Sequence, residues 1–265
     1  MLVVIRGAGD LASGIALRLH RAHMSVVMTD IEKPTAIRRT VAFSEAIVHG
    51  EAEVEGVRAR RAESVEEALE LMHHGVIPVL PDPSGVCIPA LHPDAVVDAI
   101  LAKRNLGTRM SDAPVVIGVG PGFTAGQDCH AVVETMRGHT LGRVLYEGSA
   151  LPNTGIPGLI GGFSGERVLR APADGVFHPL FDIGAQVQEG QTAATVDGIP
   201  MICTLTGVLR GILPEGTQVY KGMKAGDIDP RCKVEHCYTA SDKALAVGGG
   251  VLEALLALRE TLKEE

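Results

Sequence analysis

The chain has 265 residues, of which 46% are hydrophobic and 21% are charged, a composition typical of a globular protein with a packed core. Its formal net charge of −8 argues against nucleic acid and against an anionic membrane as partners. No apolar stretch approaches the roughly 18–20 residues of a membrane span, and the five scattered cysteines do not resemble a secreted disulfide framework. We therefore expect a cytoplasmic protein with reduced thiols.

The N-terminal thirty residues predict a strand, a glycine turn, a helix and a second strand. Residues 2–6 are a short apolar run, and Leu11, Ile15 and Leu19 then recur at helical spacing. The strand predicted at 25–29 ends at Asp30. The turn between the first strand and the helix has the pattern G-x-G-x-x-A, which is typical of dinucleotide-binding units.

This turn predicts a phosphate at the helix N-terminus and a ribose hydroxyl near the end of the second strand. The cofactor-binding residues expected here are Gly7, Gly9, Asp10, Leu11, Ala12 and Asp30. Asp10 brings negative charge to the turn, so a Rossmann-type fold with another ligand, or with none, is the alternative.

The next hundred residues alternate between predicted strands and helices. Residues 54–61 predict one strand, and Ser64 with Glu67 forms a capping box at the start of a helix over 64–74. Strands are expected at 76–80 and 115–119, with a proline-initiated helix over 92–104 between them. This alternation predicts a mostly parallel sheet.

A second glycine-rich loop follows the strand at 115–119. Its exposed N–H groups are expected to form an anion-binding nest, with Gly118, Gly120, Gly122 and Gly126 as binding residues. It lacks the Gly-Lys-Ser/Thr ending of an ATPase loop. The polar residues Asp112, Asp128 and His130 nearby are candidates for proton transfer, although a hydrogen-bonded structural set is the alternative.

The C-terminal half begins after a stretch rich in Gly, Pro, Ser and Asn at 148–165, which predicts a linker. Residues 175–190 match 207–222 at a spacing of 32, so we expect a small β-barrel or sandwich built from two half-units. Biotinyl and lipoyl domains are also two-fold repeats, but Pro200 occupies the place of their modified lysine. A covalently carried cofactor is therefore not expected.

The expected domains are a Rossmann-like α/β domain over 1–165, a barrel-sandwich repeat domain over 166–230, and a C-terminal segment over 231–265 whose helix packs back on the first domain. Cys232, His236 and Cys237 have soft ligand types that suit a metal, but their spacing is poor, and free thiols are the alternative.

Several long stretches together resemble the YqeB family, accessory proteins of selenium-dependent molybdenum hydroxylases. They are GAGDLASGIALRLHRA, TDIEKPTAIRRTVAFSEA, VVIGVGPGFTAGQDCHAVVETMRGH, GSALPNTGIPG, GDIDPR and SDKALAVGGGVLEA. The resemblance implies a factor that matures a molybdenum hydroxylase apoenzyme of the xanthine dehydrogenase type, and it is also reminiscent of XdhC-type maturation chaperones. It implies molybdopterin or a nucleotide as the cofactor.

Two other functions stay open at this point. One is an NAD(P)-dependent oxidoreductase that uses the first glycine turn and Asp30. The other is a non-catalytic scaffold whose repeat domain docks the hydroxylase. Whether the chain is itself an enzyme is left open.

Overall fold

A computed structural model describes residues 1–155 and 158–264. The chain divides into two compact units. The first unit consists of Met1–Pro34, Ala42–Asn153 and Ala240–Glu265, and the second of Thr35–Val41 and Thr154–Thr239. Among the described residues, no helix has the length and apolar character to cross a membrane.

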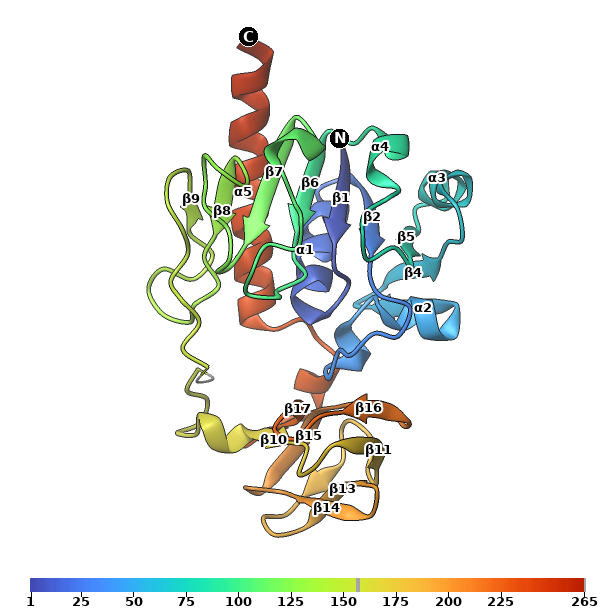
Figure 1. The fold of residues 1–265 in the computed structure, drawn as a ribbon, viewed down its shortest axis with the longest axis vertical. Helices are drawn as coiled ribbons and strands as arrows, with labels where there is room; N and C mark the ends of the chain where they lie inside the picture. The colour runs from blue at the N-terminus through green and yellow to red at the C-terminus, as the bar shows by residue number, and fades with distance from the viewer. Residues whose placement is uncertain (156–157, 265) are drawn as a thin grey trace. The chain divides into compact units, whose positions relative to one another are not determined.

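The first unit is built on a nine-stranded mixed sheet with the order β3-β4-β5-β2-β1-β6-β7-β8-β9 (Figure 1). The strands from β4 to β8 in this order are parallel to their neighbours, and the edge pairs β3/β4 and β8/β9 are antiparallel. The strands are β1 (Leu2–Arg6), β2 (Ser25–Thr29), β3 (Glu51–Val54), β4 (Val57–Arg61), β5 (Ile77–Leu80), β6 (Ala95–Asp98), β7 (Val115–Val119), β8 (Ala131–Val133) and β9 (Val144–Leu145).

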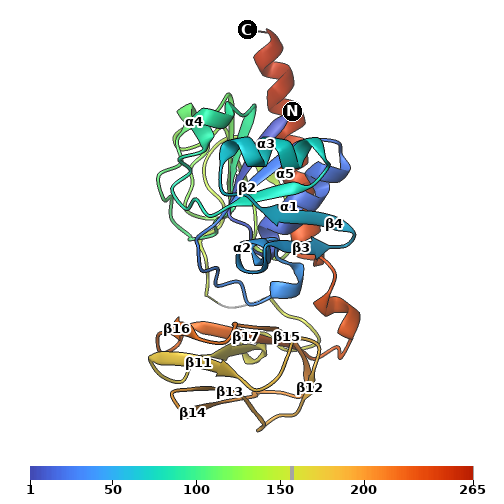
Figure 2. The same cartoon turned by 90° about the vertical axis from the view of Figure 1, so that its right-hand side faces the viewer.

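Helices cover both faces of this sheet. Two of them, α1 and α5, lie side by side on one face, and α4 lies on the other (Figures 1 and 2). Valines of the central strands, including Val4, Val96 and Val116, pack in one core with Ile88 and Leu91 of α4. The helices are α1 (Asp10–Arg21), α2 (Glu45–His49), α3 (Val65–His73), α4 (Ile88–Leu91) and α5 (Asp242–Glu264).

In the described part of the chain, short 3₁₀ segments occur in both units, one in the first unit and three in the second. They are η1 (Arg39–Val41), η2 (Met110–Asp112), η3 (Gly165–Arg167) and η4 (Val234–Cys237).

The second unit consists of two four-stranded antiparallel sheets, β10-β17-β15-β12 and β14-β13-β11-β16. The 32-residue repeat relates β11, β12 and β13 to β15, β16 and β17, and each half places its short middle strand in the sheet of the other half. The strands are β10 (Val168–Arg170), β11 (Gly175–Pro179), β12 (Gln186–Val187), β13 (Thr192–Val196), β14 (Ile199–Ile202), β15 (Gly207–Ile212), β16 (Thr217–Val219) and β17 (Lys224–Asp229).

A buried ion network lies on β17 of the second unit. Asp227 accepts hydrogen bonds from Arg167 and from Arg210, and Asp229 accepts them from Arg231. Burial opposes ionisation of Asp229, but the hydrogen bonds from Arg231 and the charge of Arg210 outweigh it and lower the pKa of that carboxyl well below its ordinary range. The carboxylate of Asp229 is therefore charged and compensated inside the unit.

The expected fold class, a Rossmann-like parallel sheet joined to a barrel-sandwich domain, was wrong. The sheet of the first unit is mixed, because hairpins form both of its edges. The second unit forms two separate four-stranded sheets. Edge pairing depends on tertiary contacts that a local alternation of strands and helices does not encode.

Two predicted elements were also wrong. The helix predicted at 92–104 is instead the buried strand β6, because its short apolar core suits either element once it lies between two strands. The single strand predicted at 54–61 is a hairpin, since Glu55 and Gly56 both have positive φ, as a two-residue turn requires.

The N-terminal strand, turn, helix and second strand are confirmed, as is the capped helix at α3, where the Ser64 side chain accepts from the Glu67 N–H. The predicted C-terminal helix begins earlier than expected, since α5 starts at Asp242 and includes Gly248–Gly250. Gly248 and Gly250 allow close packing: a Cβ at Gly248 would lie 2.9 Å from the carbonyl oxygen of Gly14.

The close approach of α1 to α5 predicts opposite effects for two glycine-to-alanine substitutions. A Cβ at Gly14 would lie 2.9 Å from the backbone carbon of Ala244, whereas a Cβ at Gly249 meets nothing within 4 Å. Gly14→Ala should therefore lower the free energy of unfolding by about 1–3 kcal/mol. Gly249→Ala should raise it by up to about 1 kcal/mol. Urea denaturation measures both, and equal effects would contradict the packing.

Candidate functional site

The candidate site lies where the parallel strands of the first unit end. In the sheet, β1 lies between β2 and β6. From β1 the chain runs through α1 to β2, and the later strand β6 pairs with the other edge of β1. The strand order therefore reverses between β1 and β6, which is a topological switch point. Ligands of open α/β sheets bind outside the carboxyl ends of the strands at such a point. The strand ends bring Arg6, Thr29 and Asp98 to this edge.

Gly7 allows the ends of β1 and β6 to approach each other. Its φ is +99°, and a Cβ there would lie only 2.7 Å from the carbonyl oxygen of Ala99. Any other residue would therefore clash with backbone as well as strain its own. This is the structural role of the first glycine of the predicted turn.

The second glycine of the turn, Gly9, precedes α1 and leaves the helix N-terminus open. As a glycine, the N-cap residue has no side chain to cap this end, and a Cβ there would meet no atom within 4 Å other than those of its chain neighbours. The first N–H groups of a helix have no acceptor inside it and carry a partial positive charge. The predicted residues Gly9 to Ala12 thus lie at the N-terminus of α1.

Asp30 is bonded to the same turn. Its Oδ2 accepts the Ala8 N–H at 2.8 Å, and its Oδ1 accepts the Ile31 N–H at 2.8 Å. Burial raises the pKa of this carboxyl above its ordinary value of 3.8, although the two backbone hydrogen bonds oppose that shift. The predicted ribose-binding residue therefore lies against the glycine turn.

The second glycine loop uses its glycines for packing. The Phe123 side chain folds back over Gly118, where a Cβ would lie 2.5 Å from it, and Gly122 lies against the backbone of Arg104. Four N–H groups of the loop already donate within the protein, those of Gly120, Thr124, Ala125 and Gly126. These four are not available to a bound anion.

The candidate proton-transfer residues around that loop do not come together as one group. Asp128 accepts from the Thr124 N–H and from Asn105, and the Nδ1 of His130 accepts the Val116 N–H. Burial lowers the pKa of His130. The neutral imidazole is therefore favoured. Its Nδ1 lone pair already accepts the N–H of Val116 in β7.

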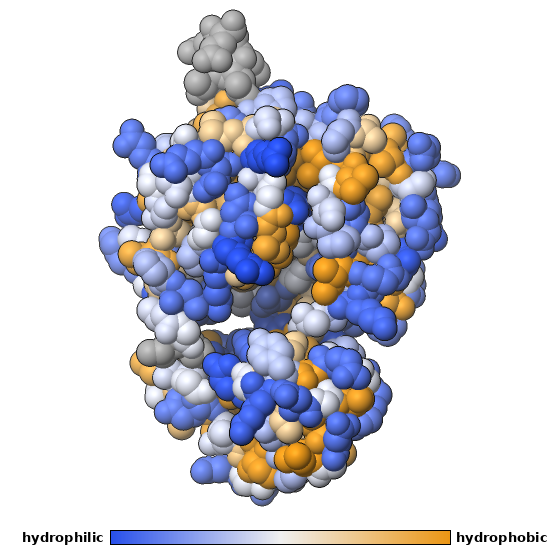
Figure 3. Space-filling view, in the orientation of Figure 1, coloured by the Kyte–Doolittle hydropathy of each residue, from blue (hydrophilic) through white to orange (hydrophobic). Residues whose placement is uncertain are grey.

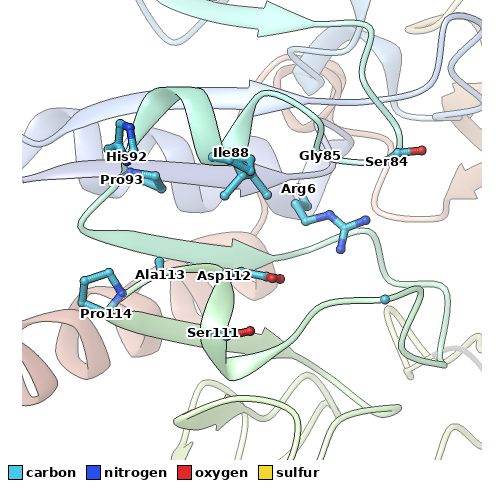
Figure 4. A pocket seen from close by; sticks show the side chains of 12 residues that line it. Arg6, Ser84, Gly85, Ile88, His92, Pro93, Ser111, Asp112, Ala113 and Pro114 are labelled. Atoms are coloured by element: carbon cyan, nitrogen blue, oxygen red, sulfur yellow. The ribbon is translucent and has the colours of Figure 1, made fainter.

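Asp112 has a different environment, because it lines a pocket of about 750 Å³ (Figure 4). Arg6 lines the same pocket and is almost completely buried. Its Nη1 donates to Asp98 at 3.5 Å and to Thr108 at 2.5 Å, and the Thr108 hydroxyl donates to Asp98 at 2.6 Å. Arg6 and Asp98 are not among the residues predicted from the sequence, although a charged residue at the end of each apolar run was a usable signal.

The weak metal candidates do not form a ligand set. Cys232 is exposed, Cys237 is buried, and the nearest acidic partner of His236 is Asp229, at 3.6 Å. Within residues 1–155 and 158–264, no group of three or more His, Cys, Asp or Glu side chains is placed to hold a metal ion.

No protein-family model matches the chain. The chain is 54% identical over 257 residues to the uncharacterized protein YqeB of Escherichia coli K12. The match covers 97% of this chain and 48% of that relative, so the chain spans about half the length of the protein it matches. The resemblance to YqeB is thus supported over nearly the whole chain.

Two solved structures show a distant likeness. An aspartoacylase family protein from Mesorhizobium loti is 12% identical, with a TM-score of 0.28, and a succinylglutamate desuccinylase/aspartoacylase from Rhodobacter sphaeroides is 15% identical, with a TM-score of 0.27. Each match covers 86% of this chain and 84% of the other. TM-scores this low do not establish a shared fold.

The raised pKa of Asp30 predicts a pH-dependent effect of Asp30→Asn. A carboxyl whose pKa is higher in the folded state stabilises the fold below its unfolded pKa, and this contribution is lost as pH rises through the folded value. The free energy of unfolding of Asp30→Asn, relative to the original protein, should therefore increase from pH 3.5 to pH 7. Urea denaturation across this range measures it, and a difference that stays constant or falls would refute the shift.

The environments of the five cysteines predict selective alkylation. Burial raises the pKa of Cys87 to about 12 and that of Cys129 to about 11, and it also raises the pKa of Cys203 and of Cys237. Only Cys232 is exposed. Iodoacetamide at pH 8 should modify Cys232 in the native protein and all five cysteines in urea, as peptide mass spectrometry would show. Rapid native modification of Cys129 or Cys237 would contradict this.

Proposed function

We propose that this chain is an accessory factor that matures a selenium-dependent molybdenum hydroxylase of the xanthine dehydrogenase type. In this proposal it binds a phosphate-bearing cofactor, molybdopterin or a nucleotide, at the N-terminus of α1. The role in maturation rests on the resemblance to the YqeB family and to XdhC-type chaperones. The binding mode rests on the geometry of the first unit.

The observation that carries the binding proposal is the open helix end at Gly9. Gly9, the N-cap residue of α1, has no side chain to cap the helix, and apart from its chain neighbours no atom lies within 4 Å of a Cβ built there. Unpaired N–H groups and the helix dipole together favour an anionic oxygen at such a position. Its location beside the switch point of β1 and β6 agrees with where ligands of this sheet type bind.

An NAD(P)-dependent oxidoreductase is the alternative that uses the same turn. Asp30 already accepts one backbone N–H on each of its oxygens, which leaves fewer lone pairs for a ribose. Asp10 and Asp30 also place two carboxyl groups near the turn, and their repulsion grows with the charge of the ligand. A ligand with one phosphate is therefore favoured over a dinucleotide pyrophosphate.

A docking scaffold is the second candidate, and surface composition favours it. Several large apolar side chains of the second unit are exposed, and Figure 3 colours apolar surface of this unit orange. They include Leu180, Ile199, Ile202 and Tyr220. In our proposal these exposed side chains of the second unit contact the hydroxylase apoenzyme.

The substitution Gly9→Asp tests the phosphate site. The backbone at Gly9 has φ −68° and ψ −176°, which any residue adopts, and Asp is a good N-cap residue. Its carboxylate should cap α1 and occupy the place of the phosphate, so the variant should remain folded and lose ligand binding. A ligand at one hundred times its Kd should add about 2.7 kcal/mol to the stability of the original protein.

A thermal-shift panel of molybdopterin, nucleoside di- and triphosphates and NAD(P)H would measure this effect. Gly165→Asp is the control, since Gly165 is exposed and, like Gly9, open around its Cβ position. Stabilisation that survives Gly9→Asp, or a panel without any effect, would refute the proposed site. Stabilisation by NAD(P)H alone, with turnover of an alcohol or carbonyl, would instead support the oxidoreductase.

A further inference from the structure

The pocket lined by Arg6 and Asp112 has no role in the phosphate site. Its volume of about 750 Å³ falls within the range of small-molecule sites, roughly 300–1,000 Å³. All of its lining residues belong to the first unit, and they come from the end of β1, the segment around α4, and the segment that leads into β7. Figure 4 shows Arg6 and Asp112 among the side chains that line this space.

Arg6 supplies hydrogen-bond donors that the protein does not use. A guanidinium carries five N–H groups, and three of these donate, to Asp98, Thr108 and the Pro83 carbonyl. The Nε has no partner although it is buried. A buried donor without an acceptor is costly, so an acceptor from a ligand, reached by a small shift of the segment at Gly85, would stabilise the site.

The charges around the pocket exclude a simple anion as that ligand. Asp98 is buried against Arg6 and compensates its charge. Asp112 adds a further carboxylate, whose Oδ2 accepts the Arg109 N–H at 2.9 Å while Oδ1 has no partner among the hydrogen bonds of the described residues. An anionic ligand would be repelled by Asp112, whereas a ligand with N–H groups would be bound by it.

The rest of the lining suits a flat ring. Ile88, Pro89, Pro93 and Pro114 supply apolar surface, and the hydroxyls of Ser84 and Ser111 lie at the pocket as well. A planar heterocycle with a carbonyl oxygen for Arg6 and adjacent N–H donors for Asp112 meets all of these conditions. A carboxylate that accepts from a ring N–H and from its neighbouring amino group makes a bidentate contact.

We propose that this pocket binds a 2-amino-4-oxopyrimidine ring, the ring that guanine and pterins share. Asp112 accepts hydrogen bonds from the ring N–H and the 2-amino group, and Arg6 donates to the 4-oxo group. The inference goes beyond the proposed phosphate site, because recognition of the ring needs no phosphate. It also assigns Asp112, first considered for proton transfer, to ligand specificity.

Calorimetric titration with guanosine, inosine and adenosine tests the ring recognition, and fluorescence titration with pterin tests the second source of the ring. Guanosine or pterin should bind, and guanosine should bind at least tenfold more tightly than inosine, which lacks the amino group, and than adenosine, which lacks the 4-oxo group. If guanosine binds and pterin does not, the ring is that of a guanine nucleotide, and the reverse result identifies a pterin. Equal affinities, or no binding of either, would overturn the proposal.

Asp112→Asn separates recognition from a structural role. An asparagine can accept the ring N–H and donate to a 2-oxo group, so the variant should lose guanosine affinity by about tenfold or more and gain affinity for xanthosine. Asp128→Asn is the matched control, since Asp128 also accepts a backbone N–H but lies outside the pocket. Loss of guanosine binding without any gain for xanthosine would count against direct contact.

Gly9→Asp distinguishes this inference from the proposed function. Guanosine carries no phosphate, so this variant should bind it as tightly as the original protein. Normal guanosine binding with no effect of any phosphate-bearing ligand would overturn the phosphate site and leave the ring pocket standing. Phosphate-dependent binding that is insensitive to Asp112→Asn and to the base would overturn the ring pocket and leave the phosphate site standing.

Discussion

The close packing of α1 against α5 is the constraint on which the first unit depends. At Gly14 and Gly248 there is no room for a side chain, since Ala244 and the backbone of α1 occupy that space. α5 comes from the end of the chain and α1 from its beginning, so this contact joins the two termini of the sequence into one body. It also holds the open N-terminus of α1 at the carboxyl ends of the strands.

The electrostatic potential at the carboxyl ends of the strands depends on which side-chain charges are compensated within the protein. Arg6 and Asp98 neutralise each other with the help of Thr108, so neither offers a free charge. Asp30 is held against the glycine turn, where burial raises its pKa. Positive potential therefore comes mainly from backbone N–H groups, which favours one well-placed anionic oxygen over a highly charged ligand.

The elements predicted correctly from the sequence are those determined by contacts between residues close in the chain. Residues 2–30 carry their own strand, turn and helix signals, and Ser64 with Glu67 caps α3 through contacts only three residues apart. The segment around Val96 has no such signal, because its apolar spacing suits a helix and a buried strand equally. That ambiguity hid Asp98, and with it the partner that keeps Arg6 at the pocket.

Glycine patterns also show that local sequence does not determine the tertiary surroundings of a residue. Gly7 and Gly9 follow the expected motif and adopt the expected geometry. Gly118 and Gly122 look equally suited to a ligand in the sequence, yet Phe123 and Arg104 occupy the space beside them. What fills the space next to a glycine depends on residues elsewhere in the chain, so composition alone cannot distinguish a binding loop from a packed one.

The second unit shows how a repeat acquires one specialised half. Its halves share their strands, but Asp227 and Arg210 of the second half correspond to Thr195 and His178 of the first. The buried pair of Asp227 and Arg210 therefore has no counterpart in the first half. Buried ion pairs contribute little net stability and are strongly destabilising when one partner is lost. Loss of Arg210 alone would leave Asp227 and Asp229 short of a compensating charge and would destabilise the arrangement around β17.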